Sequence, residues 1–471
     1  MNGWTLTARS ELRQMLRDGR VRAALIILLA LFATTLSVGS AQQSRYDSNL
    51  REAVQADRSI WERQGARNPH SVAHFGQYAF KPSGPITLFD PGLTPWLGTA
   101  LWMEAHYQNT AAYRAIDDQV APTIISNLSG AFVLQYLAPL LLIFLGYALI
   151  ARERERHTLK LVLANGASLR AWAGGKLVSL LAIAAALWLP SLALVAIGDS
   201  ADERGRSLML VLAYAGYLLM LCALILAVSA KARTARSALL ALLCGWVVMA
   251  LVIPRVAAVV AERTAPSADA GQFWRDVRVA LRQGVSGHDP ADEREKALQE
   301  KTLAQYGVTR VEDLPVSFAG IALQAGEEHG NEVFDHFYRQ LRAAEARQRT
   351  VLRIASLVSP WIALRGLSSG IAGTDAEHHA HYVHAAEKYR RELQRYLNGD
   401  MAQNAKGKDF DYQVDVETWR QTPVFSYQTP SLHEVGAAYL PDALLLLGWM
   451  MLSLIALSLA VRGLAREGAL A

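Results

Sequence analysis

Long apolar runs alternate with polar regions along this chain, and they predict its membrane topology. A helix of roughly 20 apolar residues crosses a hydrocarbon layer about 30 Å thick. Six runs reach that length and are apolar all round, which argues against a soluble protein with buried helices. The runs are Val21–Gly39, Ser126–Ile150, Leu177–Ile197, Ser207–Ala230, Ser237–Ala261 and Leu440–Val461. We therefore expect an all-α membrane protein with six transmembrane helices and a mainly helical extracytoplasmic domain with minor β-structure.

Composition supports a chain that is partly in the membrane and partly in water. Hydrophobic residues make up 52% and charged residues 19% of the 471 positions, whereas soluble domains carry about 25% charged residues. This apolar content excludes a mainly disordered chain. The only two cysteines, Cys222 and Cys244, lie inside predicted spans. The outer regions must therefore be held by packing without disulfides.

The distribution of Lys and Arg predicts the orientation in the membrane. Arginines cluster at the start of the first span, and the segments after the second, fourth and sixth spans are also basic. Short basic segments stay on the cytoplasmic side, so we expect both termini in the cytoplasm of a bacterial inner-membrane protein. We interpret the first apolar run as a retained anchor, because no convincing small-residue cleavage site accompanies it.

This topology divides the chain into five regions that alternate between membrane and water. Residues 1–39 form the cytoplasmic N-terminus and first span, and residues 40–125 form a first periplasmic region. Spans two to five occupy residues 126–261, with a cytoplasmic segment at 151–176. A large periplasmic domain at 262–439 is long enough to bury its own core. Residues 440–471 hold the sixth span and the cytoplasmic C-terminus.

Local patterns predict the structure of the second outer region. Asn331–Leu357 and Asp375–Leu397 have the apolar spacing of helices, whereas the partial alternation in Asp409–Val424 predicts a strand or extended segment. Val351–Ala372 contains charges and a proline, so we expect an amphipathic segment near the membrane surface rather than a seventh span. In Ala386–Asn398 we expect one apolar face to pack inward and the arginines to be largely solvated. The inward residues are Tyr389, Leu393 and Tyr396, and the solvated ones are Arg390, Arg391 and Arg395.

The chain lacks a complete phosphate-binding loop and the zinc-protease motif. The stretch from Arg170 to Leu177 approaches a phosphate-binding loop, but it lacks the first glycine and the final Ser or Thr. No HExxH pattern occurs, and no module for reading nucleic-acid bases is present. We expect no catalytic residue, no cofactor in this chain and no nucleic-acid partner.

Histidines gather in the predicted outer regions. His378, His381 and His384 have i,i+3 spacing on a predicted helix, and three imidazoles on one stripe suit a transition metal. A solvated polar face without a ligand is the alternative, and it is the one we expect. His70 and His74 are weaker metal candidates, because their proline-flanked segment predicts a loop without helical spacing.

The segment between the second and third spans carries the clearest functional signal. A charged start runs into a short apolar stretch that stops at Asn165-Gly166, which predicts a short helix able to dock in a groove of a partner protein. An ordinary solvated loop is the alternative. We expect the docking face to be Thr158, Leu159 and Val162, with rim carboxylates that set register. The expected contact residues are Glu153, Glu155, Thr158, Leu159, Val162 and Gly166.

The same segment resembles the coupling segment of ABC-2-type export permeases. The resemblance lies in the ERE of residues 153–155, the following Thr-Leu, the apolar stretch, the Gly turn, a Ser-x-Arg and the Gly175-Lys176 pair. The family has glycine before Thr-Leu, where this chain has His157. Four outer motifs resemble the branch with a large periplasmic domain of unknown function. They are AHFGQYAFKP (Ala73–Pro82), DPGLTPWLGTALWMEAHYQN (Asp90–Asn109), SPWIALRGLSSGIAGTD (Ser359–Asp375) and AEKYRRELQRYLN (Ala386–Asn398).

The resemblance covers nearly the whole chain and implies its function. It implies a non-catalytic permease subunit that forms a homodimer or heterodimer in the bilayer and works with two cytoplasmic ATPase subunits. ATP and Mg would be bound by those partners, and ATP hydrolysis would move a substrate across the inner membrane. The alternative is a mechanical transducer or assembly factor that drives a periplasmic partner without any substrate crossing.

Overall fold

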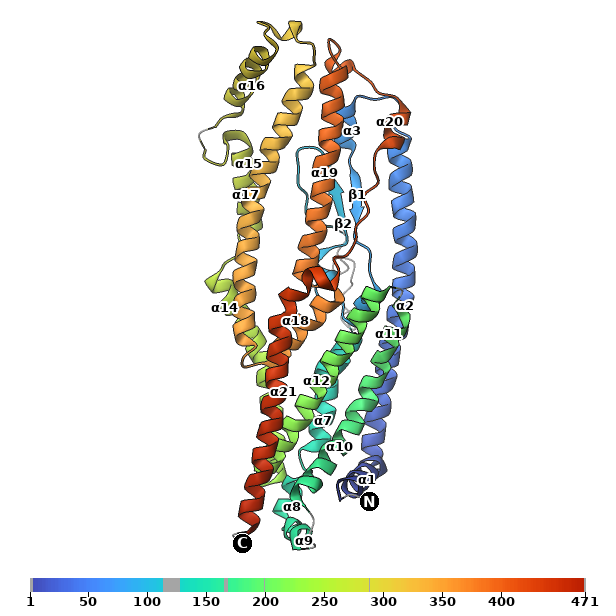
Figure 1. Ribbon diagram of the computed structural model, residues 1–471, viewed down its shortest axis with the longest axis vertical. Coiled ribbons are helices and arrows are strands. Elements are labelled where there is room, and N and C mark those ends of the chain that lie inside the picture. Colours follow the sequence, from blue (N-terminus) through green and yellow to red (C-terminus); the bar gives the residue numbers. More distant parts are fainter. Residues whose placement is uncertain (1–2, 113–127, 165–167, 199, 288, 470–471) are drawn as a thin grey trace.

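The protein is an elongated helical molecule in which both termini lie at the same end (Figure 1). The computed structural model describes residues 3–112, 128–164, 168–198, 200–287 and 289–469. Helices dominate this part of the chain, and its strands are confined to one two-stranded sheet. The expected all-α membrane fold with minor β-structure is therefore confirmed.

The predicted spans are helical in the structure. Within the described residues, six helical segments are long and apolar enough to cross a membrane. Each contains most of one predicted apolar run, but the predicted start of the second span, Ser126, lies outside the described residues. The segments are Gly19–Glu62, Gly130–Glu155, Leu169–Ile197, Ala201–Lys231, Ala235–Thr264 and Leu432–Arg466.

Several spans contain short irregular turns, so they consist of more than one element. The first span is α2 (Gly19–Glu62), the fourth is α12 (Ala201–Lys231) and the sixth lies in α21 (Leu432–Ala469). The second comprises α6 (Gly130–Phe132), the π-turn η2 (Val133–Leu137), α7 (Ala138–Gly146) and α8 (Ala151–Glu155). The third comprises α10 (Leu169–Trp188), η3 (Leu189–Leu192) and α11 (Ala193–Ile197). The fifth comprises α13 (Ala235–Val247), the π-turn η4 (Val248–Val252) and α14 (Ile253–Thr264).

Helix α12 lies at the centre of the bundle. Its side chains Tyr214 and Ile225 are fully buried in the main apolar core. A Cβ atom on Gly146 of α7 would lie 2.4 Å from Cγ2 of Ile225, so only glycine permits this approach of the two helices. Small residues allow such close packing where lipid tails give no hydrophobic drive for association.

A chain of buried polar groups joins the bundle to the segment that follows α4 (Pro85–Phe89). Gln135 of η2 donates to the Tyr214 hydroxyl at 2.6 Å, and that hydroxyl lies 2.9 Å from the Ser368 hydroxyl. Ser368 donates to the Asp90 carboxylate. Buried polar groups require such partners, so this chain fixes how the extramembrane part sits on the bundle.

Helix α18 (Pro360–Ala372) corrects the expectation of an amphipathic segment at the membrane surface. Leu364 and Ile371 are buried in the same core as the spans. Gly370 contacts the Tyr439 ring of α21 so closely that a Cβ would overlap it. The charge that suggested a surface position, Arg365, lies over the Trp361 ring at 5.3 Å. The remainder of the predicted segment, up to Ala355, belongs to the preceding helix.

The extramembrane domain consists of long helices around a small hairpin. Strands β1 (Gln77–Phe80) and β2 (Ala100–Met103) are antiparallel, with Gln77 opposite Met103. Figure 1 shows α19 rising beside this hairpin on the side away from α2, with α17 beyond α19. The helices near the hairpin are α3 (Pro69–Phe75), α4, α5 (Thr94–Leu97), α17 (Phe318–Ala355), α19 (Ala376–Asn404) and α20 (Val416–Gln421). The more peripheral elements are α15 (Ala270–Gln283), α16 (Ala291–Tyr306), η5 (Val311–Asp313) and η6 (Asp409–Asp411).

The strand or extended segment expected at Asp409–Val424 is wrong as a strand, and it is extended only at residues outside its two short helical turns, such as Tyr412, Asp415 and Thr422. This segment contains η6 and α20, and only Val414 forms an isolated bridge, with Arg67. Trp419 of α20 packs edge-on against Trp61, with ring centroids 6.2 Å apart, and both rings are fully buried. This contact fastens the far end of α2 to the extramembrane domain.

The face predicted for α19 is partly wrong. Leu393 is buried and Tyr389 partly buried, as expected, but Tyr396 is 48% exposed and Arg390 only 1% exposed. Arg390 can be buried because Glu387 and Glu327 accept hydrogen bonds from its guanidinium group at 2.8 and 3.0 Å. Charged residues enter a core when partners of this kind compensate for the lost water.

Arg391 also departs from the expectation of a largely solvated side chain. Its guanidinium forms two hydrogen bonds to Asp335 at 2.8 and 2.9 Å, and a third to Glu387 at 2.7 Å. Asp335 belongs to α17, so both arginines clamp α19 to α17. Of the three arginines, Arg395 is exposed, as expected.

Candidate functional site

The segment from the end of the second span onward lies beside the end of the molecule that carries both termini (Figure 1). It comprises α8 and the short helix α9 (Thr158–Ala164), with a turn between them. His157 forms this turn with φ 58°, in the left-handed region that glycine adopts without steric cost. The turn therefore explains why the family resemblance predicts glycine at this position.

A buried lysine holds α8 against two other helices. The Nζ atom of Lys176, in α10, donates to Glu153 of α8 at 2.6 Å and to Glu11 of α1 (Gly3–Arg17) at 2.5 Å. The lysine side chain is 1% exposed, and its ammonium lies over the Trp172 ring at 4.7 Å. Two carboxylates and an aromatic face are strong compensation for a buried charge. Glu153, expected at the rim of a partner contact, is thus used inside the chain.

Helix α1 reaches this node because α10 presents a glycine to it. A Cβ atom on Gly175 would lie 2.5 Å from the Cβ of Thr7 and 2.6 Å from the carbonyl oxygen of Trp4. Any larger residue would push α1 away. The Gly175-Lys176 pair that contributed to the family resemblance therefore has two structural roles, close packing and charge pairing.

Further hydrogen bonds tie α8 to the fourth and fifth spans. Arg154 donates to the carbonyl oxygens of Ala230 and Lys231 at the end of α12, at 3.1 and 3.3 Å. Glu155 accepts from the backbone N–H of Ala235, at the start of α13, at 3.0 Å. A carboxylate at a helix N-terminus satisfies a free N–H and complements the helix dipole. Glu155, like Glu153, is thus engaged within the chain.

Two of the three residues expected on the docking face of α9 point inward in the structure. Leu159 is 8% exposed in the main core and Val162 packs against that core, so both face the spans. On the outside lie Thr158 and Leu161, the latter 64% exposed. The sequence did not reveal which leucines face inward, because almost every position from 159 to 163 is apolar. Gly166, the last expected contact residue, lies outside the described residues.

The histidine stripe on α19 is not the fully solvated face that we expected, because its first member is buried and each of its first two members contacts a different neighbour. His378 is fully buried, and its Nδ1 atom lies 2.8 Å from Asp375 and 3.2 Å from the Tyr439 hydroxyl. His381 instead faces Tyr427, with its Nδ1 atom 3.1 Å from the hydroxyl. Hydrogen bonding to His378 is one cause that lowers the pKa of the Asp375 carboxyl, against the opposing effect of its burial. These contacts anchor α19 to α21.

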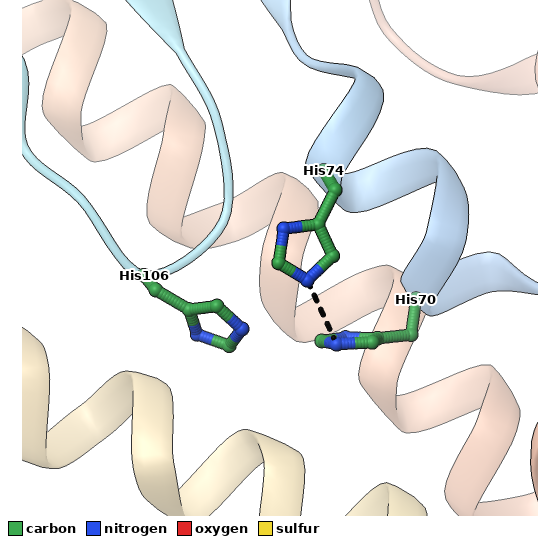
Figure 2. Close-up of side chains that lie close together, drawn as sticks. All are labelled: His70, His74 and His106. Atoms are coloured by element: carbon green, nitrogen blue, oxygen red, sulfur yellow. Dashed lines mark hydrogen bonds between the residues drawn. The ribbon is translucent and has the colours of Figure 1, made fainter.

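Three other histidines come together at the far end of the extramembrane domain. His70 and His74 lie one turn apart on α3, and His106 follows β2 (Figure 2). One ligand atom from each lies within 4.8 Å of the others. Burial, followed by the neighbouring rings of His74 and His106, lowers the pKa of His70 to about 4. Within the described residues, this is the set of histidines that can share a metal ion.

Sequence reasoning gave His70 and His74 little weight as metal ligands and did not connect His106 with them, because it treated residues 69–75 as a loop. The signal was present: Asn68-Pro69 is a helix-start pattern, and the Asn68 side chain accepts hydrogen bonds from the N–H groups of His70 and Ser71. That start places His70 and His74 on one face. The position of His106 beside these two residues depends on the pairing of β1 with β2, which no local sequence pattern predicted.

Comparison with known proteins agrees with the fold and the resemblance. A family model described as ABC-2 family transporter protein matches residues 6–302, well over half of the chain. A second model, described as Domain of unknown function (DUF3526), matches residues 270–428 in the extramembrane domain. No curated protein and no solved structure gives a significant match. The chain therefore belongs to the ABC-2 family of transporter proteins, as a multi-pass membrane subunit that carries a DUF3526 domain.

Proposed function

We propose that the chain is the permease subunit of an ATP-driven transporter and that α8 and α9 receive the movement of a separate ATPase. In this proposal the end that carries both termini faces the cytoplasm of a bacterium, and the extramembrane domain lies in the periplasm. Basic residues at the helix ends near the termini support this orientation. The family membership supports an ATPase partner, which would bind ATP and Mg.

One observation carries the proposal: α8 is bound to three spans and to α1 by polar contacts. The Lys176 node joins it to α10 and α1, while Arg154 and Glu155 join it to α12 and α13. A solvated loop would need none of these contacts. A push on this segment is transmitted to the packed spans, because closely packed elements move as rigid bodies.

The surface that would meet the ATPase is the outer side of α9. Leu161 and Thr158 are exposed there, next to the basic residues Arg152 and Arg156. An exposed leucine flanked by charges is the usual composition of a small contact surface, with an apolar centre and a polar rim. The basic residues suit an acidic groove, whereas the sequence alone suggested that the segment offers carboxylates.

A second permease subunit belongs to the same proposal. The apolar windows of α2 and of α13–α14 are each only 17% buried in a single chain. Lipid and a second permease, identical or related, would share these faces. Two permeases with two ATPases form the assembly that we propose.

A mechanical transducer is the second candidate function, and one observation favours it. Helix α2 runs without a break from Gly19 to Glu62, and the Trp61 indole donates to the Thr422 hydroxyl at 2.8 Å. Tilting of the first span would therefore move the far end of the extramembrane domain. A water-soluble thiol reagent applied during ATP turnover distinguishes the two functions at Cys222, which is buried in α12. Labelling in a Cys244→Ser background supports an opening path, and complete protection supports transduction.

The proposed role of α9 is tested by co-purification with the ATPase subunits of the transporter. Leu161→Asp should release the ATPase and abolish coupled ATP hydrolysis, whereas Leu161→Met should retain both. Gel filtration of each variant checks that the membrane subunit is folded. Retention of the ATPase by Leu161→Asp at wild-type stoichiometry and turnover would contradict the proposal.

A further inference from the structure

We propose that His70, His74 and His106 form a binding site for a divalent late first-row transition metal, with Zn²⁺ as the reference ion. This inference is independent of the proposed transport function. The site lies in the extramembrane domain, at the far end of the molecule from α8 and α9 (Figure 1). It rests on the geometry of the three rings, on the residues that hold them and on the space beside them.

The rings are close to the geometry of a metal centre. The Nε2 atoms of His70 and His74 lie 3.1 Å apart. Two nitrogens bound to one tetrahedral zinc ion at about 2.0–2.1 Å lie about 3.3–3.4 Å from each other. Figure 2 shows a ring nitrogen of His106 directed toward the other two rings. All three ligand atoms fall within 4.8 Å, so small rotations of the side chains complete the set.

Glu327 orients His106 as a second-shell residue would. One oxygen of its carboxylate lies 2.7 Å from both the backbone nitrogen and the Nδ1 atom of His106. This bond places the proton on Nδ1 and leaves the Nε2 lone pair for a metal. Glu327 is itself held by Arg390 at 3.0 Å, in a fully buried pair. Both oxygens of the Glu327 carboxylate are therefore engaged within the protein, so this residue supports His106 and is not itself a metal ligand in the proposal.

The backbone of His106 adds a second sign of a constrained position. Its φ of 67° lies in the left-handed region, which is sterically unfavourable for a residue with a side chain. Such strain persists only where the surroundings impose it, and it concentrates at ligand sites. Here the two contacts to Glu327 impose it.

The site is open to solvent through a large cavity. A space of about 930 Å³ between α16, α17 and the segment before α20 is lined by His106 and Phe410. The Phe410 ring also packs on His70, with centroids 6.2 Å apart. A metal ion can enter this way, and a fourth coordination position can face the cavity.

The chemistry of the ligands selects the class of metal. Imidazole nitrogen suits Zn²⁺, Cu²⁺ and Ni²⁺, whereas Mg²⁺ and Ca²⁺ require oxygen ligands. Both cysteines of the chain lie in the spans, so no thiolate is available to favour Cu⁺. Metal binding would join α3 to the segment after β2, and through Glu327 to α17.

The test is a zinc titration of the full-length chain in detergent, purified through a tag without histidine. Protein stripped with a chelator and then saturated with Zn²⁺ should retain one ion per chain after desalting. His70→Ala/His74→Ala should lose that ion, whereas His384→Ala, an exposed histidine on α19, should keep it. Co²⁺ in place of Zn²⁺ should give the intense visible absorption of a tetrahedral site in the wild type and lose it in the double variant.

A variant with one substitution distinguishes the loss of a metal ligand from misfolding of the protein. His74 is exposed, so His74→Gln should leave the unfolding temperature of the metal-free protein unchanged and still weaken Zn²⁺ binding at least tenfold. The proposal is overturned if the wild type holds no more Zn²⁺ than the double variant, or if His384→Ala loses the ion to the same extent. Unchanged affinity in a folded His74→Gln protein overturns it as well.

Discussion

The Nζ atom of Lys176 lies 2.6 Å from a carboxylate oxygen of Glu153, and this contact fastens the segment after the second span to the start of the third. Because Glu11 of α1 shares the same ammonium group, three elements depend on one buried charge. The family signature at these positions therefore has a structural meaning: it joins α8, α10 and α1 through one buried charge.

The first prediction concerns this joint. Lys176→Met leaves two carboxylates facing each other without a cation, and removing one member of a buried ion pair costs about 3–5 kcal/mol. We expect a lower unfolding temperature in detergent. Neutralising both acids as well, with Glu11→Gln and Glu153→Gln, should recover most of the loss. A single variant as stable as the wild type would show that the node does not hold these helices together.

The second prediction compares two adjacent glycines of α10. A Cβ on Gly175 would collide with α1, whereas nothing lies within 4 Å of a Cβ on Gly174. Alanine is favoured over glycine in a helix by up to about 1 kcal/mol. Gly174→Ala should therefore preserve or raise stability, while Gly175→Ala should displace α1 and expose residues 3–17 to limited proteolysis. Equal protease resistance of the two variants would argue against the packing of α1 on α10.

The third prediction concerns the clamp between α17 and α19. Arg390→Met removes the guanidinium group that Glu327 and Glu387 share in the core, although Glu387 keeps Arg391 and Glu327 keeps His106. Removing one member of a buried ion pair costs about 3–5 kcal/mol, and the remaining partners place the expected loss at the lower end of this range. Arg395→Ala, on the exposed side of the same helix, should change the free energy of unfolding by less than about 0.5 kcal/mol. Chemical denaturation of the two variants measures the difference, and similar midpoints would show that Arg390 is not in the core.

The fourth prediction is a loss of stability in acid. Burial, with a smaller contribution from nearby Lys81, lowers the pKa of His379 from 6.5 to about 4. Between pH 6.5 and 4 the unfolded chain therefore binds more protons at this residue than the folded chain does, so stability falls as the pH falls through this window. His379→Gln should reduce the drop in unfolding temperature between pH 7 and pH 5. An unchanged drop would show that His379 does not contribute.

Much of this architecture was predictable from the sequence, for a physical reason. A lipid-spanning helix must be apolar over its whole length. A single long run such as Val21–Gly39 therefore suffices to predict a span without knowledge of the rest of the fold. The burial of Arg390 could not be predicted from the local sequence, because it depends on Glu327, 63 residues away in the sequence. Local sequence patterns indicate whether a side chain usually lies in the core or in solvent, whereas partners distant in the sequence determine where it lies in this fold.

The same reasoning explains the results at both candidate sites. The charge and apolar pattern predicted the short helix that forms α9, but two residues expected on its outer face, Leu159 and Val162, pack toward the spans. A helix with apolar residues at nearly every position gives no facing signal, so the burial of Leu159 and the exposure of Leu161 required the packed structure. The cluster of His70, His74 and His106 depended on the pairing of β1 with β2, which brings two distant segments together.

Site-specific photo-crosslinking in α9 tests the central claim most directly. A photoreactive amino acid replaces Thr158, Leu159 or Leu161 in turn, and each variant is irradiated in complex with the ATPase subunits. Positions 158 and 161 should crosslink to the ATPase, whereas position 159, which faces the spans, should not. No crosslink at 161, or equal crosslinking at 159 and 161, would contradict the assignment of α9 as the surface that receives the ATPase.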